Sequence, residues 1–143
     1  MIDGLLKSKI DSYVDELIRK AEELVRKTKV YERTQTSQIQ NLVNIASSTN
    51  SLEAIKLYIQ YQTARGLLKA EGDFSTDLIN YISNKNYISN NLPSIAKNIA
   101  GEDTETFNEV LFKLIQLFFG YLKRVFVCFE KPKKSSKEES GSE

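Results

Sequence analysis

A run of apolar residues at helical spacing, between residues 107 and 126, constrains the fold more than any other feature of the chain. The run consists of Phe107, Val110, Leu111, Leu114, Ile115, Phe118, Tyr121, Leu122, Val125 and Phe126. Intervals of three and four residues place these side chains on one face of an α-helix. Glu102, Asp103 and Glu105 precede the run, where negative charge suits a helix N-terminus. The sequence therefore predicts a long amphipathic helix at the centre of the core.

Five further segments have the same helical period. They span residues 3–28, 36–46, 50–66, 73–84 and 93–101. No strand-like alternation, internal repeat or linker interrupts this series, and a chain of 143 residues fits one domain. We therefore predict an all-α fold, a compact bundle of about five main helices plus a short one, over residues 1–129. Residues 130–143 lack periodicity and carry balanced charges, which predicts a disordered tail.

Local signals suggest where the central helices begin and end. Ser37 and Gln40 match a capping box, in which each side chain bonds a free backbone amide of the first turn. The next helix is expected to begin at Asn50 or Ser51, for the same reason. Glycine permits the left-handed backbone that terminates many helices, so this helix should end at Gly66 or at Gly72.

Composition excludes several classes of function. The chain contains no histidine and one cysteine, Cys128, so histidine-based catalysis and cysteine-rich zinc sites are absent. The acids at residues 102–109 read as ordinary stabilisers of a first helical turn rather than as metal ligands. No glycine-rich phosphate loop or signal peptide is recognisable. We expect a cytoplasmic protein that is not an enzyme and has no metal site and no cofactor.

Basic residues are the first candidates for a binding surface. The net charge is only +1, so an anion-binding surface requires local clustering. The candidates, besides Arg26 and Lys27, are Lys29, Arg33, Arg65, Lys69, Lys123 and Arg124. Arg65 and Lys69 would share a face if their helix continued through Gly66. Converging helix ends would form a sequence-independent RNA groove, whereas scattered, solvated charges explain the same spacing equally well.

The aromatic-rich stretch 117–129, followed by several lysines, has two interpretations. It could dock on an anionic membrane surface, since basic residues lie directly behind it. It is too short and too interrupted to span a bilayer. Core packing is the commoner fate of such a stripe, and we expect no membrane contact.

Two short segments carry a family resemblance. Thr36-Ser37-Gln38-Ile39 precedes Tyr61-Gln62-Thr63-Ala64-Arg65 by about twenty residues. Together with the size and the helical pattern, these segments resemble the small subunit of type III-A CRISPR effector complexes (Csm-type), an all-helical, non-catalytic protein. The family tends to place a basic residue directly after the first segment, where this chain has Gln40.

The resemblance implies a partner set and a role. It implies a subunit that stacks with copies of itself along a ribonucleoprotein filament and contacts the RNA backbone of the guide–target duplex, while other subunits cut. Arg65 and Gln40 are RNA-binding candidates by matched position. Lys29, Arg33, Lys69, Lys123 and Arg124 are candidates from local charge alone.

Two other functions compete with RNA binding. The first is a helical scaffold or adaptor that binds only protein, through the apolar face of its last helix. An enzyme comes third, because histidine and a phosphate loop are missing.

Overall fold

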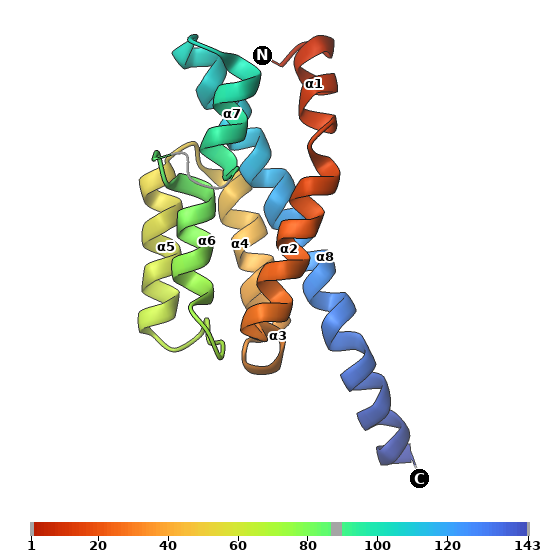
Figure 1. Cartoon of the computed structure of the whole chain (residues 1–143). Coiled ribbons are helices and arrows are strands. Elements are labelled where there is room, and N and C mark those ends of the chain that lie inside the picture. The colour runs from red at the N-terminus through yellow and green to blue at the C-terminus, as the bar shows by residue number, and fades with distance from the viewer. Residues whose placement is uncertain (1, 87–89, 143) are drawn as a thin grey trace.

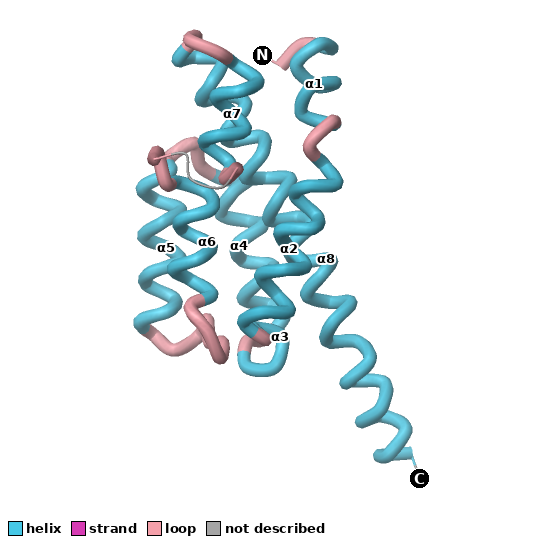
Figure 2. The backbone as a smooth tube through the Cα atoms, in the orientation of Figure 1, coloured by secondary structure: helices cyan, strands magenta, loops and turns pink. Residues whose placement is uncertain are grey.

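The computed structural model describes residues 2–86 and 90–142, and side chains as far as Glu130. The described residues form eight α-helices and no strand (Figures 1 and 2). The helices are α1 (Gly4–Asp11), α2 (Val14–Thr28), α3 (Val30–Arg33), α4 (Thr36–Ser48), α5 (Leu52–Ala64), α6 (Phe74–Ser83), α7 (Leu92–Ala100) and α8 (Thr104–Ser142). The predicted all-α class is confirmed. The predicted count of five main helices and a short one is too low.

The first extra helix arises because the segment predicted as one helix, residues 3–28, is broken in the middle. The Tyr13 amide donates to the Ile10 carbonyl at 3.0 Å, and the Ser12 hydroxyl donates to the Lys9 carbonyl at 2.6 Å. This tight turn ends α1 and redirects the chain. As a result α1 contacts α7 and α8, whereas α2 packs along α8 and α6.

The second extra helix follows a left-handed residue. Lys29 has a φ of 52° and its amide donates to the Val25 carbonyl at 2.9 Å, which closes α2. The four residues of α3 begin immediately afterwards. A lysine in this backbone conformation carries no sequence signal, because glycine and asparagine usually occupy it.

The predicted helix limits are partly right. The central helix α4 begins at Thr36, but the predicted capping box does not form, since no side chain caps this helix. In α5 the Ser51 hydroxyl accepts from the Ala54 amide at 3.0 Å, as expected of an N-cap. That helix ends at Ala64, and Gly66, two residues further on, has the left-handed φ of 78° expected of a terminating glycine.

The long helix α8 is the centre of the bundle. Figure 1 shows it running the length of the molecule, and it contacts α1, α2, α3, α4 and α7. Its buried side chains are Val110, Leu111, Leu114, Ile115, Phe118, Phe119, Leu122 and Phe126. The predicted burial of its apolar face is confirmed for most of the predicted positions, whereas Phe107, Tyr121 and Val125 are half-buried. Each of the large apolar side chains that is buried stabilises the fold by about 1.5–3 kcal/mol.

Among the described residues, one buried hydroxyl in the core is unsatisfied. Tyr81 of α6 is buried, with its ring 4.7 Å from that of Phe118, and its hydroxyl has no hydrogen-bond partner among the described residues. Burial raises the pKa of this hydroxyl well above the ordinary 10.0, and the nearby carboxylates of Glu16 and Glu23 raise it further.

The helix α8 continues beyond the body of the bundle. The predicted domain limit at residue 129 falls inside it, and its backbone is helical as far as Ser142 (Figure 1). The side chains beyond Glu130 lie outside the described residues, so the disordered tail over 130–143 stays a prediction.

Candidate nucleic-acid interface

Several helix ends meet at one end of the bundle. Figure 1 shows α3 and the α5–α6 connection together at its lower end, and α2 leads into α3 there. Arg33 is the last residue of α3, Arg65 follows the last residue of α5, and Lys69 lies in the α5–α6 connection. Three of the predicted basic residues are thus brought to one end of the molecule by three different segments.

A buried threonine fixes the position of Lys69. The Thr34 hydroxyl donates to the Lys69 carbonyl at 2.7 Å and accepts from the Lys69 amide at 2.8 Å. Nearby, the Glu71 amide donates to the Thr28 carbonyl at 2.8 Å. These bonds hold the α5–α6 connection against the α2–α4 junction. Because Thr34 follows Arg33 directly, they also place Lys69 beside Arg33.

Arg33 and Lys69 line a shared hollow of about 280 Å³. Its other lining residues are Thr63, Leu68, Ala70, Gly72, Asp73, Phe74, Ser75 and Thr76. Both cations are exposed, and within the described residues neither forms an ion pair. One carboxylate, Asp73, and three hydroxyls accompany them. The Thr63 hydroxyl donates to the Ile59 carbonyl at 2.7 Å, so the Ser75 hydroxyl is the donor to Thr63. A phosphate oxygen at this hollow would therefore meet two cations and the Thr76 hydroxyl.

Arg65 lies on the neighbouring helix end, but the predicted helical face that would join it to Lys69 does not exist. A pair of backbone bonds, from Gly66 to the Thr63 carbonyl and from Leu67 to the Gln62 carbonyl, terminates α5. The Lys69 side chain instead folds back over Gly66, where a Cβ atom would lie 3.3 Å from its Cε.

The Arg65 guanidinium is held by its own helix. Its Nη1 donates to Gln62 Oε1 at 3.2 Å, and it lies over the Tyr61 ring at 5.4 Å from the centroid. Gln62 is 5% exposed, and its Nε2 donates to Gln38 Oε1 of α4 at 2.8 Å. Sequence reasoning missed this bond between helices, since nothing along the chain pairs residues 38 and 62.

Gln40 and Lys123 also come together. The Lys123 ammonium of α8 donates to Gln40 Oε1, and Gln40 Nε2 donates to Asn44 Oδ1 at 2.9 Å. Gln40, which follows the Thr36–Ile39 segment directly, is therefore tied through its amide to a lysine from another helix. Arg124, the neighbour of Lys123, lies over the Tyr121 ring of its own helix at 5.4 Å.

Two of the basic residues at this end are neutralised. Lys29 Nζ lies 3.8 Å from Glu71 Oε2, and Lys27 Nζ lies 3.2 Å from Asp77 Oδ2. Lys29 was predicted as a candidate RNA contact, and its charge is already compensated within the protein. Arg26, by contrast, lies over the Phe129 ring and forms no ion pair among the described residues.

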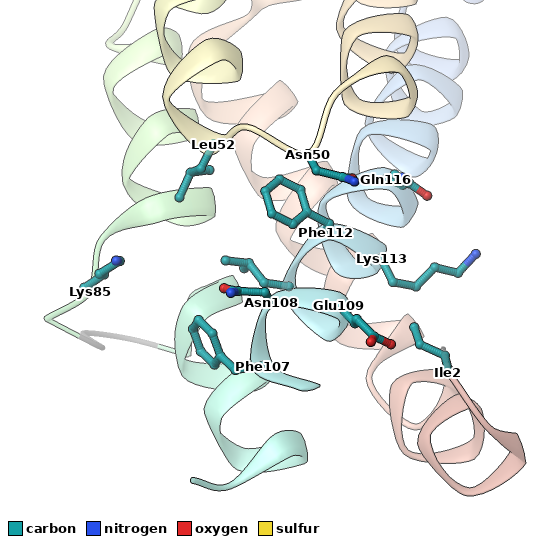
Figure 3. Close-up of a pocket in the computed structure, with 11 residues that line it drawn as sticks. Ile2, Asn50, Leu52, Lys85, Phe107, Asn108, Glu109, Phe112, Lys113 and Gln116 are labelled. Carbon is teal, nitrogen blue, oxygen red and sulfur yellow. The ribbon is translucent and has the colours of Figure 1, made fainter. Parts of the chain in front are cut away.

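A second hollow lies away from these residues, beside the start of α8. It has a volume of about 670 Å³, and Figure 3 shows Leu52, Phe107 and Phe112 around it with Asn50, Lys85 and Gln116 at its edges. None of the predicted site residues lines it. On the outer side of α5, Leu57 and Tyr61 are 64% and 57% exposed.

The burial of α8 limits how much of its apolar face can bind a protein partner. Its fully buried apolar residues up to Phe126 pack inside the bundle, whereas Phe107 and Phe112 are half-buried and line the second hollow. Within the described part of the chain, no helix combines the length and apolar character needed to cross a membrane. The described side chains also include no cluster of cysteines and carboxylates that could hold a metal ion.

Comparison with known proteins adds no family to these observations. Neither a family model, nor a curated protein, nor a solved structure matches this chain.

Proposed function

We propose that this chain is a small, non-catalytic subunit of a type III-A CRISPR ribonucleoprotein that contacts the RNA backbone along the guide–target duplex. One observation supports this most: Arg33, Arg65 and Lys69, from three separate segments, lie at one end of the bundle without carboxylate partners among the described residues. The resemblance in residues 36–39 and 61–65 points the same way.

The chemistry of these residues suits a phosphate backbone. Arginine and lysine that neutralise phosphates release condensed counterions, which supplies most of the affinity of sequence-independent binding. The same end of the bundle contains two lysines that are already neutralised by Glu71 and Asp77. The free cations are therefore distinguishable from the merely structural ones, and they come to lie together only in the folded chain.

A single copy of such a subunit would bind weakly. Non-specific binding to nucleic acid typically has dissociation constants of about 10⁻⁴–10⁻⁶ M at physiological salt. Copies stacked side by side along one RNA would add their contacts at a high effective concentration. The partners that this proposal requires are therefore RNA, larger effector subunits and further copies of the chain, in the cytoplasm.

Purification from the native cell tests the proposal directly. The tagged chain should bring down larger proteins together with RNA, and ribonuclease treatment should reduce the recovered mass without releasing every protein partner. Recovery of protein partners with no RNA, in buffers of low ionic strength, would contradict the proposal.

That contrary outcome would support a protein-only scaffold, which specific features favour as the second candidate. Leu52, Phe107 and Phe112 line part of the second hollow (Figure 3), and Leu57 and Tyr61 form an exposed apolar pair on successive turns of α5. Exposed apolar groups of this kind commonly mark protein contacts.

A further inference from the structure

The outer face of α4, close to several of the basic residues, is polar and uncharged. The helix contains no charged residue at all. Ser37, Asn41, Asn44 and Ser48 fall at helical spacing along it, and three of them are exposed while Asn41 is half-buried. We call these four residues and the flanking amide of Gln38 the α4 amide face.

A hydrogen-bond relay reaches this face from α5. The Arg65 guanidinium donates to Gln62, and the Gln62 amide then donates to Gln38 Oε1 at 2.8 Å. The carbonyl oxygen of Gln38 is thereby occupied from the inside. Its NH₂ group has no partner among the described residues, so the relay ends in a free donor.

A second relay reaches the face from α8 with the same polarity. Lys123 donates to Gln40 Oε1, and Gln40 Nε2 donates to Asn44 Oδ1 at 2.9 Å. The oxygen of Asn44 is occupied in turn, and its NH₂ group is the free end. Each relay starts from a cation, and each bond polarises the next in the same sense. Both flanks of the face therefore present amide donors.

The α4 amide face and its two flanking cations define the kind of ligand that would fit them. Such a ligand needs acceptor oxygens along a shallow surface. It also needs negative charge on both sides, where Arg65 and Lys123 lie. The minor groove of A-form RNA is wide and shallow, displays 2′-hydroxyls, and is bordered by two phosphate strands. The B-form DNA minor groove is about 6 Å wide and has no 2′-hydroxyl, so it fits the face poorly.

Resting on the proposed RNA-backbone function, we infer that the α4 amide face binds the minor groove of an A-form duplex and selects RNA over DNA. Gln38 and Asn44 donate to 2′-hydroxyl oxygens, while Arg65 and Lys123 meet the phosphates on either side. The cations alone would bind any nucleic acid. The amides make the contact specific for ribose.

The test uses the full chain and two duplexes of one sequence, RNA–RNA and DNA–DNA, at about 50 mM salt, where phosphate contacts are strong. NMR titration gives both dissociation constants and follows the side-chain NH₂ signals directly. We expect the RNA duplex to bind about two- to tenfold more tightly for each hydroxyl contact. The NH₂ signals of Gln38 and Asn44 should shift with RNA and stay in place with DNA.

Isosteric variants, together with a charge control, separate the loss of an amide donor from the effect of an added negative charge. In Gln38→Glu and Asn44→Asp the oxygen that accepts from Gln62 or Gln40 is retained, so the helix contacts survive while the free donor is replaced. Gln60→Glu is the matched control, because Gln60 is exposed on α5 and belongs to neither relay. All three variants should weaken binding to both duplexes through the added negative charge. Only the first two should reduce the preference for RNA.

The outcomes separate this inference from the function on which it rests. Equal binding of RNA and DNA, weakened in both by Arg65→Ala, would overturn the ribose selectivity and leave backbone binding standing. An RNA preference that Gln38→Glu and Asn44→Asp do not reduce would also overturn it. No binding of either duplex, with the variants folded, would remove the proposed function itself.

Discussion

Replacing Arg33 and Lys69 with alanine should make RNA binding less sensitive to salt. The fold should survive, because Thr34 holds Lys69 through backbone atoms that alanine retains, at 2.7 and 2.8 Å. Each phosphate contact contributes about 0.7–0.9 to the slope of log K against log salt, so losing two contacts should lower the slope by about 1.4–1.8. Between about 50 and 200 mM salt, the wild-type affinity should then fall about seven- to twelvefold more than that of the double variant.

The measurement belongs on the assembled complex, where many copies raise the affinity into a convenient range. Lys29→Ala is the matched control, since Lys29 already lies 3.8 Å from a Glu71 carboxylate oxygen and should release few counterions. It should change the slope far less than either Arg33→Ala or Lys69→Ala. An unchanged slope in a folded double variant would refute the assignment of these two cations to RNA phosphates. A change of slope in Lys29→Ala as large as that in Arg33→Ala or Lys69→Ala would refute the assignment too.

Three further predictions concern the elements that shape this end of the molecule and its core. Thr34→Val should lower the free energy of unfolding by about 1–3 kcal/mol in urea titrations, because the Lys69 backbone groups lose their partner; an unchanged midpoint would contradict this. Gly66→Ala should cost about 1–2 kcal/mol because the backbone there has a φ of 78°, whereas Gly72→Ala, which lacks that constraint, should cost less. Tyr81→Phe should leave stability unchanged or raise it, since the hydroxyl is buried without a partner among the described residues. The raised pKa of Tyr81 means that wild-type stability is complete below pH 10.0 and declines as the pH rises above it, where only the unfolded chain ionises. The variant should lose less stability over that pH range, and equal pH profiles would argue against this cause.

Features that depend on neighbours along the chain were predictable. The α8 face follows from a spacing of three and four residues, and the end of α5 follows from the freedom of Gly66. The break at Ser12 and Tyr13 was not predictable, because the apolar period continues across it. The turn directs α1 onto α7 and α8, and no local signal encodes that contact.

The candidate interface was predictable only as a set of cations. Charge pattern identifies Arg33, Arg65 and Lys69, but the sequence does not reveal that Lys29 is neutralised by Glu71, which lies far away along the chain. The amide relays are equally invisible, because glutamine has no preferred partner until folding places one beside it. A run of 13 residues in α4 without any charge was the available signal.

The central position of α8 determines when the chain can fold during its synthesis. During synthesis α1 to α7 leave the ribosome before the helix against which α2, α4 and α7 bury their apolar faces. Until residue 126 has emerged, those faces have no common partner and stay exposed to solvent, chaperones and other nascent chains. Folding should therefore be late and nearly all-or-none with respect to chain length. A stalled chain with residues 110–126 still inside the ribosome would be sensitive to protease throughout its emerged length. A chain with residue 126 held outside the ribosome by a C-terminal extension would be a resistant bundle.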